Sequence, residues 1–362
     1  MSRGHGVFDT PHVWMPEGCL DAWHTAKAGS AGSQVPVVIL GDSIAQGYNA
    51  TSFNRTSWEA VVRIALQARY GEAGRYFGVS DSVKLTPFIV AGDVAWTLPA
   101  AGWTNFSMLG FQGYLLGANG DAATFAPPGA YAFVDFDLKV SQAPDGSTAT
   151  LTVDTVGQTA PTYFNAGYLR HVTFQYTGFA SATHTVVVTQ TQAAKVAYLA
   201  GAVCYPRGRG ASGLLWVREA LQGSTSLIAM PQYPTQQAAY LGSKGSIEDW
   251  APKLVVVALG VNDCQNWVGV EQFAWNLAQL AQSAQNAGSS LVVLMSYGAS
   301  SFTNAAAYGQ YVAAAREVAH SFNAAFVNAH SAFGAAAGLI GSGGHPNDAG
   351  HALMANLLLG IL

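Results

Sequence analysis

Three side chains in the sequence have the types that acyl transfer needs: Ser43 and Asn262 follow apolar runs, and His345 comes just before the last expected helix. Ser43 stands in the motif GDSIAQG, Asn262 in GVND and His345 in GGHPNDAGH. A serine hydroxyl becomes a nucleophile when a histidine takes its proton, and a side-chain amide can stabilise the oxyanion that then forms. These residue types therefore indicate nucleophilic catalysis, on condition that the fold brings the three segments together.

The segments around these residues alternate between strand and helix patterns. Residues 35–40 and 254–260 are apolar and rich in β-branched side chains, which is typical of parallel strands covered on both faces. The remaining spacing predicts strands at 291–297 and 324–329 and helices at 57–70, 272–287, 305–322 and 349–358. This alternation predicts an α/β domain with a parallel sheet and right-handed crossovers. Ligands bind beyond the carboxyl ends of such strands, where we expect all three side chains to lie.

The segment from 83 to 205 has a different pattern. Apolar and polar residues alternate over 134–140, a Pro-Asp-Gly turn follows, and residues 148–153 form the partner strand. Further strands are predicted at 171–177, 184–190 and 195–205. We therefore expect an antiparallel β-sandwich inserted into the α/β domain. The predicted division is an N-terminal extension and linker at 1–34, a first α/β part at 35–82, the insert at 83–205 and a second α/β part at 206–362.

Composition excludes several classes of function. With 16 Lys and Arg against 20 Asp and Glu, the chain has no basic excess for binding a phosphate backbone, so we expect no nucleic-acid partner. The three cysteines lie far apart without a CxxC motif, which excludes a zinc site and a dense disulfide framework but leaves one pair open. No run of about 18 apolar residues occurs. We expect a protein without a membrane span and without a cofactor or metal.

The three motifs, in this order and context, resemble those of the SGNH (GDSL-type) hydrolase superfamily of esterases and deacetylases. The resemblance covers roughly residues 35–80 and 206–362 and implies a flavodoxin-like, three-layer α/β/α domain with a parallel sheet. It implies that Ser43 is the nucleophile, that His345 is the general base, and that the Ser43 N–H and Asn262 form the oxyanion hole. A glycine usually completes this hole. Gly213, just after the insert and before an expected helix, is the candidate, with Gly210 as the alternative.

A Gly-Asp-Ser turn also has a purely structural interpretation, in which glycine relieves strain and Asp or Ser caps a helix. We expect Asp42 to support the nucleophile turn through hydrogen bonds, and Asp263 to stabilise the loop after its strand. Neither carboxylate is expected to react with the substrate.

The sequence departs from the superfamily pattern at one position. Members usually carry an aspartate three residues before the catalytic histidine, and here that residue is Ser342. Loss of the orienting acid lowers turnover of a serine protease by about 10⁴-fold. Three accounts stay open: a backbone carbonyl or Ser342 itself orients His345, another carboxylate such as Asp348 replaces the acid, or catalysis is weak.

The run Asp348-Ala-Gly-His351 also spells the DxxH pattern. We interpret it as the start of the last helix, with Asp348 complementing the helix dipole and His351 inside the first turns. His351 as the general base is the alternative.

The expected activity is that of a serine esterase that removes short acyl groups, such as acetyl, from a carbohydrate or similar polymer. The insert resembles, more loosely, carbohydrate-binding sandwiches of phage-associated and bacterial members, and a structural lid is its alternative role. An inactive scaffold in an adhesin or phage tail and an acyltransferase are the competing functions. Low charge and the missing apolar leader predict an extracellular or virion-associated location. The oligomeric state is left open.

Overall fold

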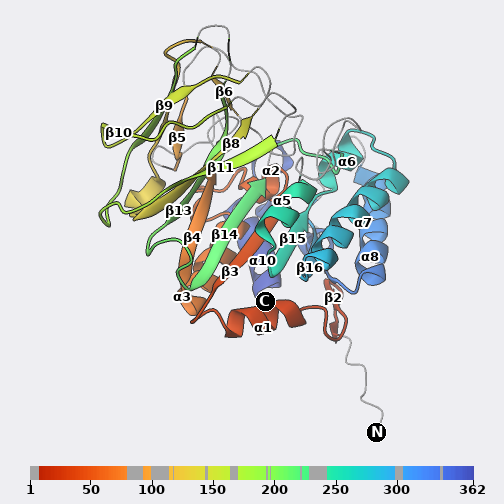
Figure 1. The fold of residues 1–362 in the computed structure, drawn as a ribbon. Coiled ribbons are helices and arrows are strands. Elements are labelled where there is room, and N and C mark those ends of the chain that lie inside the picture. The colour runs from red at the N-terminus through yellow and green to blue at the C-terminus, as the bar shows by residue number, and fades with distance from the viewer. Residues whose placement is uncertain are drawn as a thin grey trace.

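A computed structural model of the protein describes residues 8–79, 93–98, 114–116, 118–142, 146–163, 170–192, 195, 197–220, 222–227, 243–297, 305–334 and 337–362. Its main feature is a twelve-stranded sheet (Figure 1). Next to the parallel strand β4 (Glu72–Gly78), five further parallel strands lie side by side in the order β14-β3-β15-β16-β17, which is the flavodoxin-like order. Their bounds are Gly213–Ala220, Gln34–Gly41, Leu254–Ala258, Ser290–Met295 and Ala325–Asn328. The predicted fold class is confirmed.

Helices cover both faces of the parallel strands (Figure 1). On one face α3 (Trp58–Tyr70) packs against α10 (Asp348–Leu359). On the other face α7 (Val270–Asn286) packs against α5 (Ser243–Trp250) and α8 (Ala305–Ser321). Each helix except α5 was predicted from its apolar spacing. The three layers exclude water from both faces of the strands, which explains why their sequences lack polar alternation.

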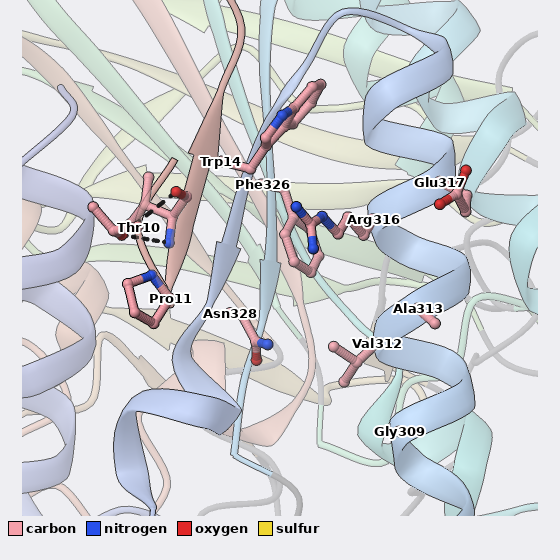
Figure 2. A pocket seen from close by; sticks show the side chains of 11 residues that line it. Thr10, Pro11, Trp14, Gly309, Val312, Ala313, Arg316, Glu317, Phe326 and Asn328 are labelled. Atoms are coloured by element: carbon pink, nitrogen blue, oxygen red, sulfur yellow. Dashed lines mark hydrogen bonds between the residues drawn. The ribbon is translucent and has the colours of Figure 1, made fainter. Parts of the chain in front are cut away.

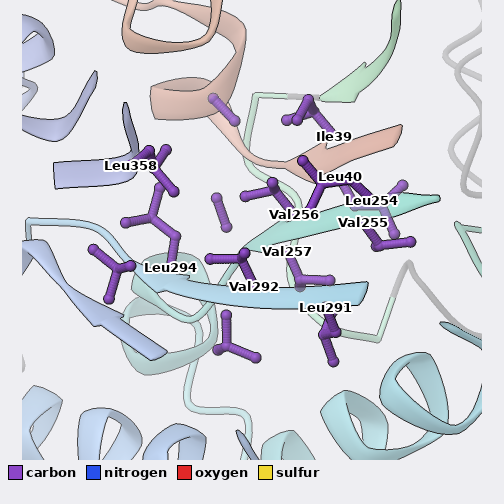
Figure 3. Close-up of a cluster of buried hydrophobic side chains, with 14 of the residues drawn as sticks. Ile39, Leu40, Leu254, Val255, Val256, Val257, Leu291, Val292, Leu294 and Leu358 are labelled. Atoms are coloured by element: carbon purple, nitrogen blue, oxygen red, sulfur yellow. The ribbon is translucent and has the colours of Figure 1, made fainter. Parts of the chain in front are cut away.

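The core of this domain is built from aliphatic side chains of neighbouring strands (Figure 3). Ile39 of β3, Val256 of β15 and Leu294 of β16 are all at most 1% exposed. Each such side chain stabilises the fold by about 1.5–3 kcal/mol when it leaves water. The register also aligns the strand ends, because Gly41 of β3 lies beside Ala220 of β14 and Ala258 of β15. Loops after these three strands therefore start at the same edge.

The N-terminal residues differ from the predicted extension and linker. Strand β1 (Phe8–Asp9) pairs with β2 (Val13–Met15), and β2 adds an antiparallel strand to β17. Helix α1 (Asp21–Ala28) follows, and its Trp23 is fully buried. The Trp23 indole N–H donates to the carbonyl of Leu362 at 3.1 Å. Residues 8–28 are thus part of the α/β domain.

The segment between α3 and β14 is antiparallel, as predicted. Strand β4 (Glu72–Gly78) pairs with β13 (Ala197–Tyr205), which continues the large sheet through β8 (Asp135–Gln142) to β11 (Arg170–Tyr176), with β6 (Tyr114–Leu116) beside β13. A second sheet has the order β10-β9-β12-β7-β5, with bounds Val156–Gln158, Ala149–Val153, Val186–Gln190, Ala122–Phe125 and Trp96–Thr97.

Side chains between the two sheets form a second hydrophobic cluster. Phe136 and Leu199 come from the large sheet and Phe125, Leu151 and Val188 from the five-stranded sheet, and all are at most 1% exposed. This cluster is distinct from the α/β core. The boundaries at 83 and 205, and the status of the segment as an inserted domain, stay predictions. Strands β8, β11 and β13 belong to the same sheet as the parallel strands of the α/β domain.

The segment after Gly213 forms a strand where a helix was expected. Leu, Arg, Glu and Ala in LLWVREAL favour a helix in isolation. In the fold these residues form β14, which is parallel to β3 on one side and β4 on the other. Its Arg218 is buried because the guanidinium donates to Glu59 at 3.0 Å. Tertiary pairing has therefore overridden local propensity.

Candidate active site

The nucleophile turn is formed by the motif GDSIAQG. Helix α2 (Ser43–Gln46) begins directly after β3, and the Asp42 carboxylate caps it by accepting from the Ile44 N–H at 2.9 Å. Gly41 and Gly47 permit close approaches. A Cβ at Gly41 would lie 3.1 Å from the Ala258 carbonyl, and Gly47 has a φ of 95° with the Ser57 Cβ 2.7 Å from where its own would be. The cap therefore comes from Asp42 and leaves the Ser43 hydroxyl available.

The structure brings Ser43 and His345 together from positions 302 residues apart. The Ser43 Oγ–H donates to His345 Nε2 at 2.8 Å. His345 follows a short 3₁₀ turn (Ser342–Gly344) and precedes α10. The Tyr48 ring lies against the imidazole, with ring centroids 4.3 Å apart. This pair has the distance that proton transfer from a serine nucleophile to a histidine base requires.

A main-chain carbonyl occupies the position of the missing acid. The His345 Nδ1–H donates to the Gly343 carbonyl at 3.1 Å, which fixes the tautomer that leaves Nε2 as an acceptor. The Ser342 hydroxyl donates instead to Asn49 Oδ1 at 3.1 Å. Asp348 accepts from the Thr51 N–H at 2.7 Å and the Thr56 hydroxyl at 2.8 Å. Of the three accounts, the geometry therefore favours the backbone carbonyl.

His351 is a structural residue in this geometry. Its imidazole is fully buried inside α10. Nε2–H donates to the Tyr48 carbonyl at 3.0 Å, and Nδ1 accepts from the Trp58 N–H at 3.3 Å. Because both ring nitrogens have backbone partners, the ring is held neutral, and burial lowers its pKa to about 4. The cap of α10 is Asn347, whose side chain accepts from the Gly350 N–H, while Asp348 lies in the first turn.

Asn262 lies at the same sheet edge as Ser43. It is in the short helix α6 (Val261–Gln265), which begins just after β15. The side-chain amide donates one bond to the Ser224 carbonyl at 3.0 Å, and an amide has a second N–H to offer. The neighbouring Asp263 accepts from the Ser226 N–H at 2.9 Å. Both contacts hold the loop after β14 against α6.

The placement of Gly213 differs from the expectation. Gly213 opens β14 and is paired with Gln34, the first residue of β3, so it lies at the edge opposite to Ser43. Its φ of 116° serves a close approach to the Gly71 backbone instead. Gly210 precedes it on the same side of the strand. The position of Gly213 was wrongly predicted because a helix was expected where β14 lies. A glycine before a strand and a glycine after it lie at opposite edges of a sheet.

Gly223 is the glycine at the correct edge. It follows β14, has a φ of 79°, and has no atom within 4 Å of the position that a Cβ would take. On one side of it the Gln222 N–H donates to the Gln46 side chain of α2 at 3.0 Å, and on the other Ser224 accepts from Asn262. Reading 213–220 as a strand would have revealed this position from the sequence.

Burial shifts the pKa values of the titratable groups of the site. Burial lowers the pKa of His345, and the hydrogen bond to Gly343 partly opposes this shift. Burial raises the pKa of Asp42 to about 7 and that of Asp263 to about 6. Among the described residues, no group of three or more His, Cys, Asp or Glu could hold a metal ion. Cys19, Cys204 and Cys264 are buried and are not disulfide-bonded.

A pocket of about 350 Å³ lies between α8 and strand β2 (Figure 2). Trp14, Arg316 and Asn328 are among its lining residues, and none of the predicted site residues lines it. In the part of the chain that the structure describes, no helix has the length and hydrophobicity that a membrane crossing requires.

A flavodoxin-like sheet with a serine, a histidine and an asparagine amide at one edge defines the SGNH class of carboxylic ester hydrolases. Residues 189–353 match the family described as GDSL-like Lipase/Acylhydrolase. This part of the chain is similar to that family, and the chain is a carboxylic ester hydrolase. The match includes Asn262 and His345, whereas Ser43 lies before it and joins the site through the fold.

One solved structure shares the fold over most of its length. The chain is similar to a peptidoglycan O-acetylesterase, with 14% identity, 94% of this chain and 93% of that chain covered, and a TM-score of 0.63. It is also similar to a catalytic mutant of an acetylxylan esterase from Geobacillus stearothermophilus, with 19% identity, coverage of 41% and 71%, and a TM-score of 0.35. No curated protein matches the sequence.

Proposed function

We propose that the protein is a serine esterase that removes short acyl groups, above all acetyl, from a carbohydrate polymer through an acyl-enzyme on Ser43. The observation that carries this proposal is the 2.8 Å hydrogen bond from the Ser43 hydroxyl to His345, whose other ring nitrogen donates to Gly343. A nucleophile, its base and a group that orients the base are the three parts that nucleophilic acyl transfer requires.

In the first half-reaction, Ser43 Oγ attacks the ester carbonyl carbon while His345 Nε2 takes the hydroxyl proton. The tetrahedral oxyanion faces the Ser43 N–H and the Asn262 amide. We propose the Gly223 N–H as the third donor, in place of Gly213. Removal of one such donor typically lowers turnover by about 10²–10³-fold. His345 then returns the proton to the leaving alcohol oxygen as the C–O bond breaks.

In the second half-reaction, water attacks the acyl carbon of the acetyl-enzyme while His345 Nε2 takes its proton. His345 then returns the proton to Ser43 Oγ as the bond from Oγ to the acyl carbon breaks and the acid is released. The imidazolium that forms in both steps donates its Nδ1–H to the Gly343 carbonyl. A neutral carbonyl stabilises this charge less than a carboxylate does, but it preserves the tautomer, whose loss is the larger defect. Asp42 and Asp263 act on the protein backbone and not on the substrate in this scheme.

The substrate class rests on the fold likeness over 94% of this chain to a protein named a peptidoglycan O-acetylesterase. Acetyl esters on sugar hydroxyls of a polymer are therefore the first substrates to test. We keep an extracellular or virion-associated location as part of this proposal, since such polymers lie outside the cytoplasm.

The test compares the protein with Ser43→Ala and with the control Ser321→Ala, an exposed serine of α8. Acetate release from O-acetylated peptidoglycan and acetylated xylan is measured beside hydrolysis of p-nitrophenyl acetate and butyrate. We expect Ser43→Ala to lose about 10³-fold or more of the activity and Ser321→Ala to keep it. Thermal melts establish that all three proteins are folded.

Equal rates for the protein and Ser43→Ala on every substrate would contradict the proposal and favour a non-catalytic binding module. A sugar acceptor that becomes acetylated faster than acetate appears would identify an acyltransferase on the same nucleophile. The acetate-to-butyrate ratio reports the acyl length that the site accepts.

A further inference from the structure

The acceptor of the His345 Nδ1–H belongs to a loop that has little to hold it. Residues 341–344 are Gly-Ser-Gly-Gly, and Gly343 and Gly344 have φ values of 62° and 73°, which glycine adopts readily. Gly343 is exposed. Within the loop the Gly341 N–H donates to the His345 carbonyl at 2.8 Å, and the His345 N–H reaches the Ser342 carbonyl at 3.4 Å. Such a loop contributes no apolar packing that would fix the carbonyl direction.

The Asn49 side chain spans this loop from outside. Its Nδ2 donates to the Ser342 carbonyl and, at 3.4 Å, to the His345 carbonyl, so it contacts both ends of the turn that contains Gly343. Its Oδ1 accepts from the Ser342 hydroxyl at 3.1 Å. The loop also packs closely on the amide, since a Cβ at Gly341 would lie 3.0 Å from Asn49 Nδ2.

The Asn49 backbone is fixed to the nucleophile turn. Its φ of 65° lies in the left-handed region, which Asn tolerates better than most residues. Before it, the Tyr48 N–H donates to the Ser43 carbonyl at 2.9 Å, and after it the Ala50 N–H donates to the Gly47 carbonyl at 3.1 Å. One residue therefore connects the segment that carries the nucleophile to the loop that carries the base.

We infer that Asn49 is a positioning residue: its side-chain amide holds the 341–345 loop so that the Gly343 carbonyl meets the His345 Nδ1–H. It replaces by a network of hydrogen bonds what the usual aspartate does by direct contact. The inference rests on the proposed function for its catalytic consequence, whereas the orientation of His345 can be measured without a substrate.

Two substitutions separate the effect of the Asn49 side-chain amide from the effect of the Asn49 backbone conformation. Asn49→Gly removes the side chain and keeps the left-handed conformation, which glycine adopts without strain. Asn49→Asp keeps the shape and the acceptor for Ser342 but loses the two N–H donors. The matched control is Asn286→Gly at the end of α7, an exposed asparagine far along the chain from the site. Thermal melts accompany each variant.

The first readout is the tautomer of His345, measured by ¹⁵N NMR of the histidine rings at pH 8, with the His345 signals assigned by their loss in His345→Asn. We expect the unaltered protein to show the Nδ1–H tautomer alone, and both Asn49 variants to show a mixture. A role in stability alone would not move this ratio while the protein stays folded.

The second readout is steady-state kinetics on p-nitrophenyl acetate. We expect kcat to fall by about 10²-fold in both Asn49 variants, with KM changed less than threefold, because misplacement of a catalytic group acts on the transition state. A single tautomer in both variants, or a kcat within threefold of the unaltered protein, would overturn the inference. If Asn49→Gly fails to fold, Asn49→Asp decides by the same criteria. If the unaltered protein has no Ser43-dependent activity, the proposed function fails, and the tautomer ratio still decides the role of Asn49.

Discussion

At the scale of single residues, the site depends on which group receives the proton of His345 Nδ1. The Gly343 carbonyl at 3.1 Å is a neutral acceptor, so it raises the pKa of the imidazole less than a carboxylate would. Burial of the ring beside Tyr48 disfavours its charged form. The result is a base that stays neutral, and hence competent, in mildly acidic solution.

This electrostatic balance gives a pH prediction. The pKa of His345 lies below its ordinary value of 6.5, and catalysis needs the neutral ring. The acidic limb of kcat/KM for acetyl ester hydrolysis should therefore have its midpoint below pH 6.5. A pH–rate profile of the free enzyme checks this directly. A midpoint above 6.5 would show that a carboxylate, and not the Gly343 carbonyl, faces Nδ1.

At the scale of elements, hydrogen bonds join α10 and the loop before it to residues 48–51, which follow the nucleophile turn. Tyr48 accepts from His351, Asn49 donates to the histidine loop, and the Thr51 N–H donates to Asp348. Asp348 and His351, the DxxH-like pair, thus connect α10 to a segment that is far away in the sequence. Asp348 is partly exposed, whereas His351 is buried.

Substitution of Asp348 tests this division of roles. Asp348→Ala removes the acceptor for the Thr51 N–H and the Thr56 hydroxyl, and we expect a loss of about 1–3 kcal/mol in the free energy of unfolding. These hydrogen bonds join Asp348 to Thr51 and Thr56 and not to the His345 ring, so kcat/KM should change less than tenfold. Urea denaturation and ester kinetics measure the two effects. A loss of several hundredfold without unfolding would instead make Asp348 an orienter of the base.

At the scale of the whole molecule, the buried His351 links stability to pH. Its pKa is about 4 in the fold and 6.5 in the unfolded chain, so below pH 6.5 the unfolded state takes up a proton that the native state does not. Stability from this group is complete above pH 6.5 and is lost as the pH falls toward 4. The full difference is about 3 kcal/mol.

Asp42, whose pKa is raised to about 7, changes the free energy of unfolding with pH in the opposite direction. The contribution of His351 is therefore measured as the difference between the unaltered protein and a variant without this ring. His351→Asn keeps an acceptor for the Trp58 N–H and removes the titrating ring. We expect this variant to be less stable at pH 7 and to lose less stability between pH 7 and pH 5 than the unaltered protein. His320→Asn, at an exposed position of α8, should keep the original slope. Equal slopes for His351→Asn and the unaltered protein in chemical denaturation would contradict the assignment.

Much of the α/β architecture followed from hydrophobic pattern. Strands β3, β15, β16 and β17 are apolar on both faces, and this local signal survives without knowledge of partners. Strand β14 was missed because its polar residues are buried against a distant partner: Trp216 and Arg218 both donate to Glu59 of α3. The same error moved the third oxyanion candidate from Gly223 to Gly213, at the wrong edge of the sheet.

The N-terminal region shows the same limit. Residues 26–34 are small and polar, which is typical of a linker, yet Trp23 and β2 attach this region to Ser290, Leu362 and β17. Burial of a tryptophan depends on a surface that the rest of the chain builds. A local window of sequence does not contain that surface.

The sequence by itself identified the proposed reacting groups, because Ser43, Asn262 and His345 each stand in a motif whose residues lie next to one another in the chain. Only the tertiary structure showed which group accepts from His345 Nδ1, which glycine lies at the same sheet edge as Ser43, and which groups Asp348 and His351 contact. The physical reason is that these contacts use main-chain carbonyls and N–H groups, which every residue has, and join segments about 300 residues apart. A hydrogen bond to a main-chain group does not require a particular residue type, so the sequence does not indicate it and only the folded chain reveals the contact.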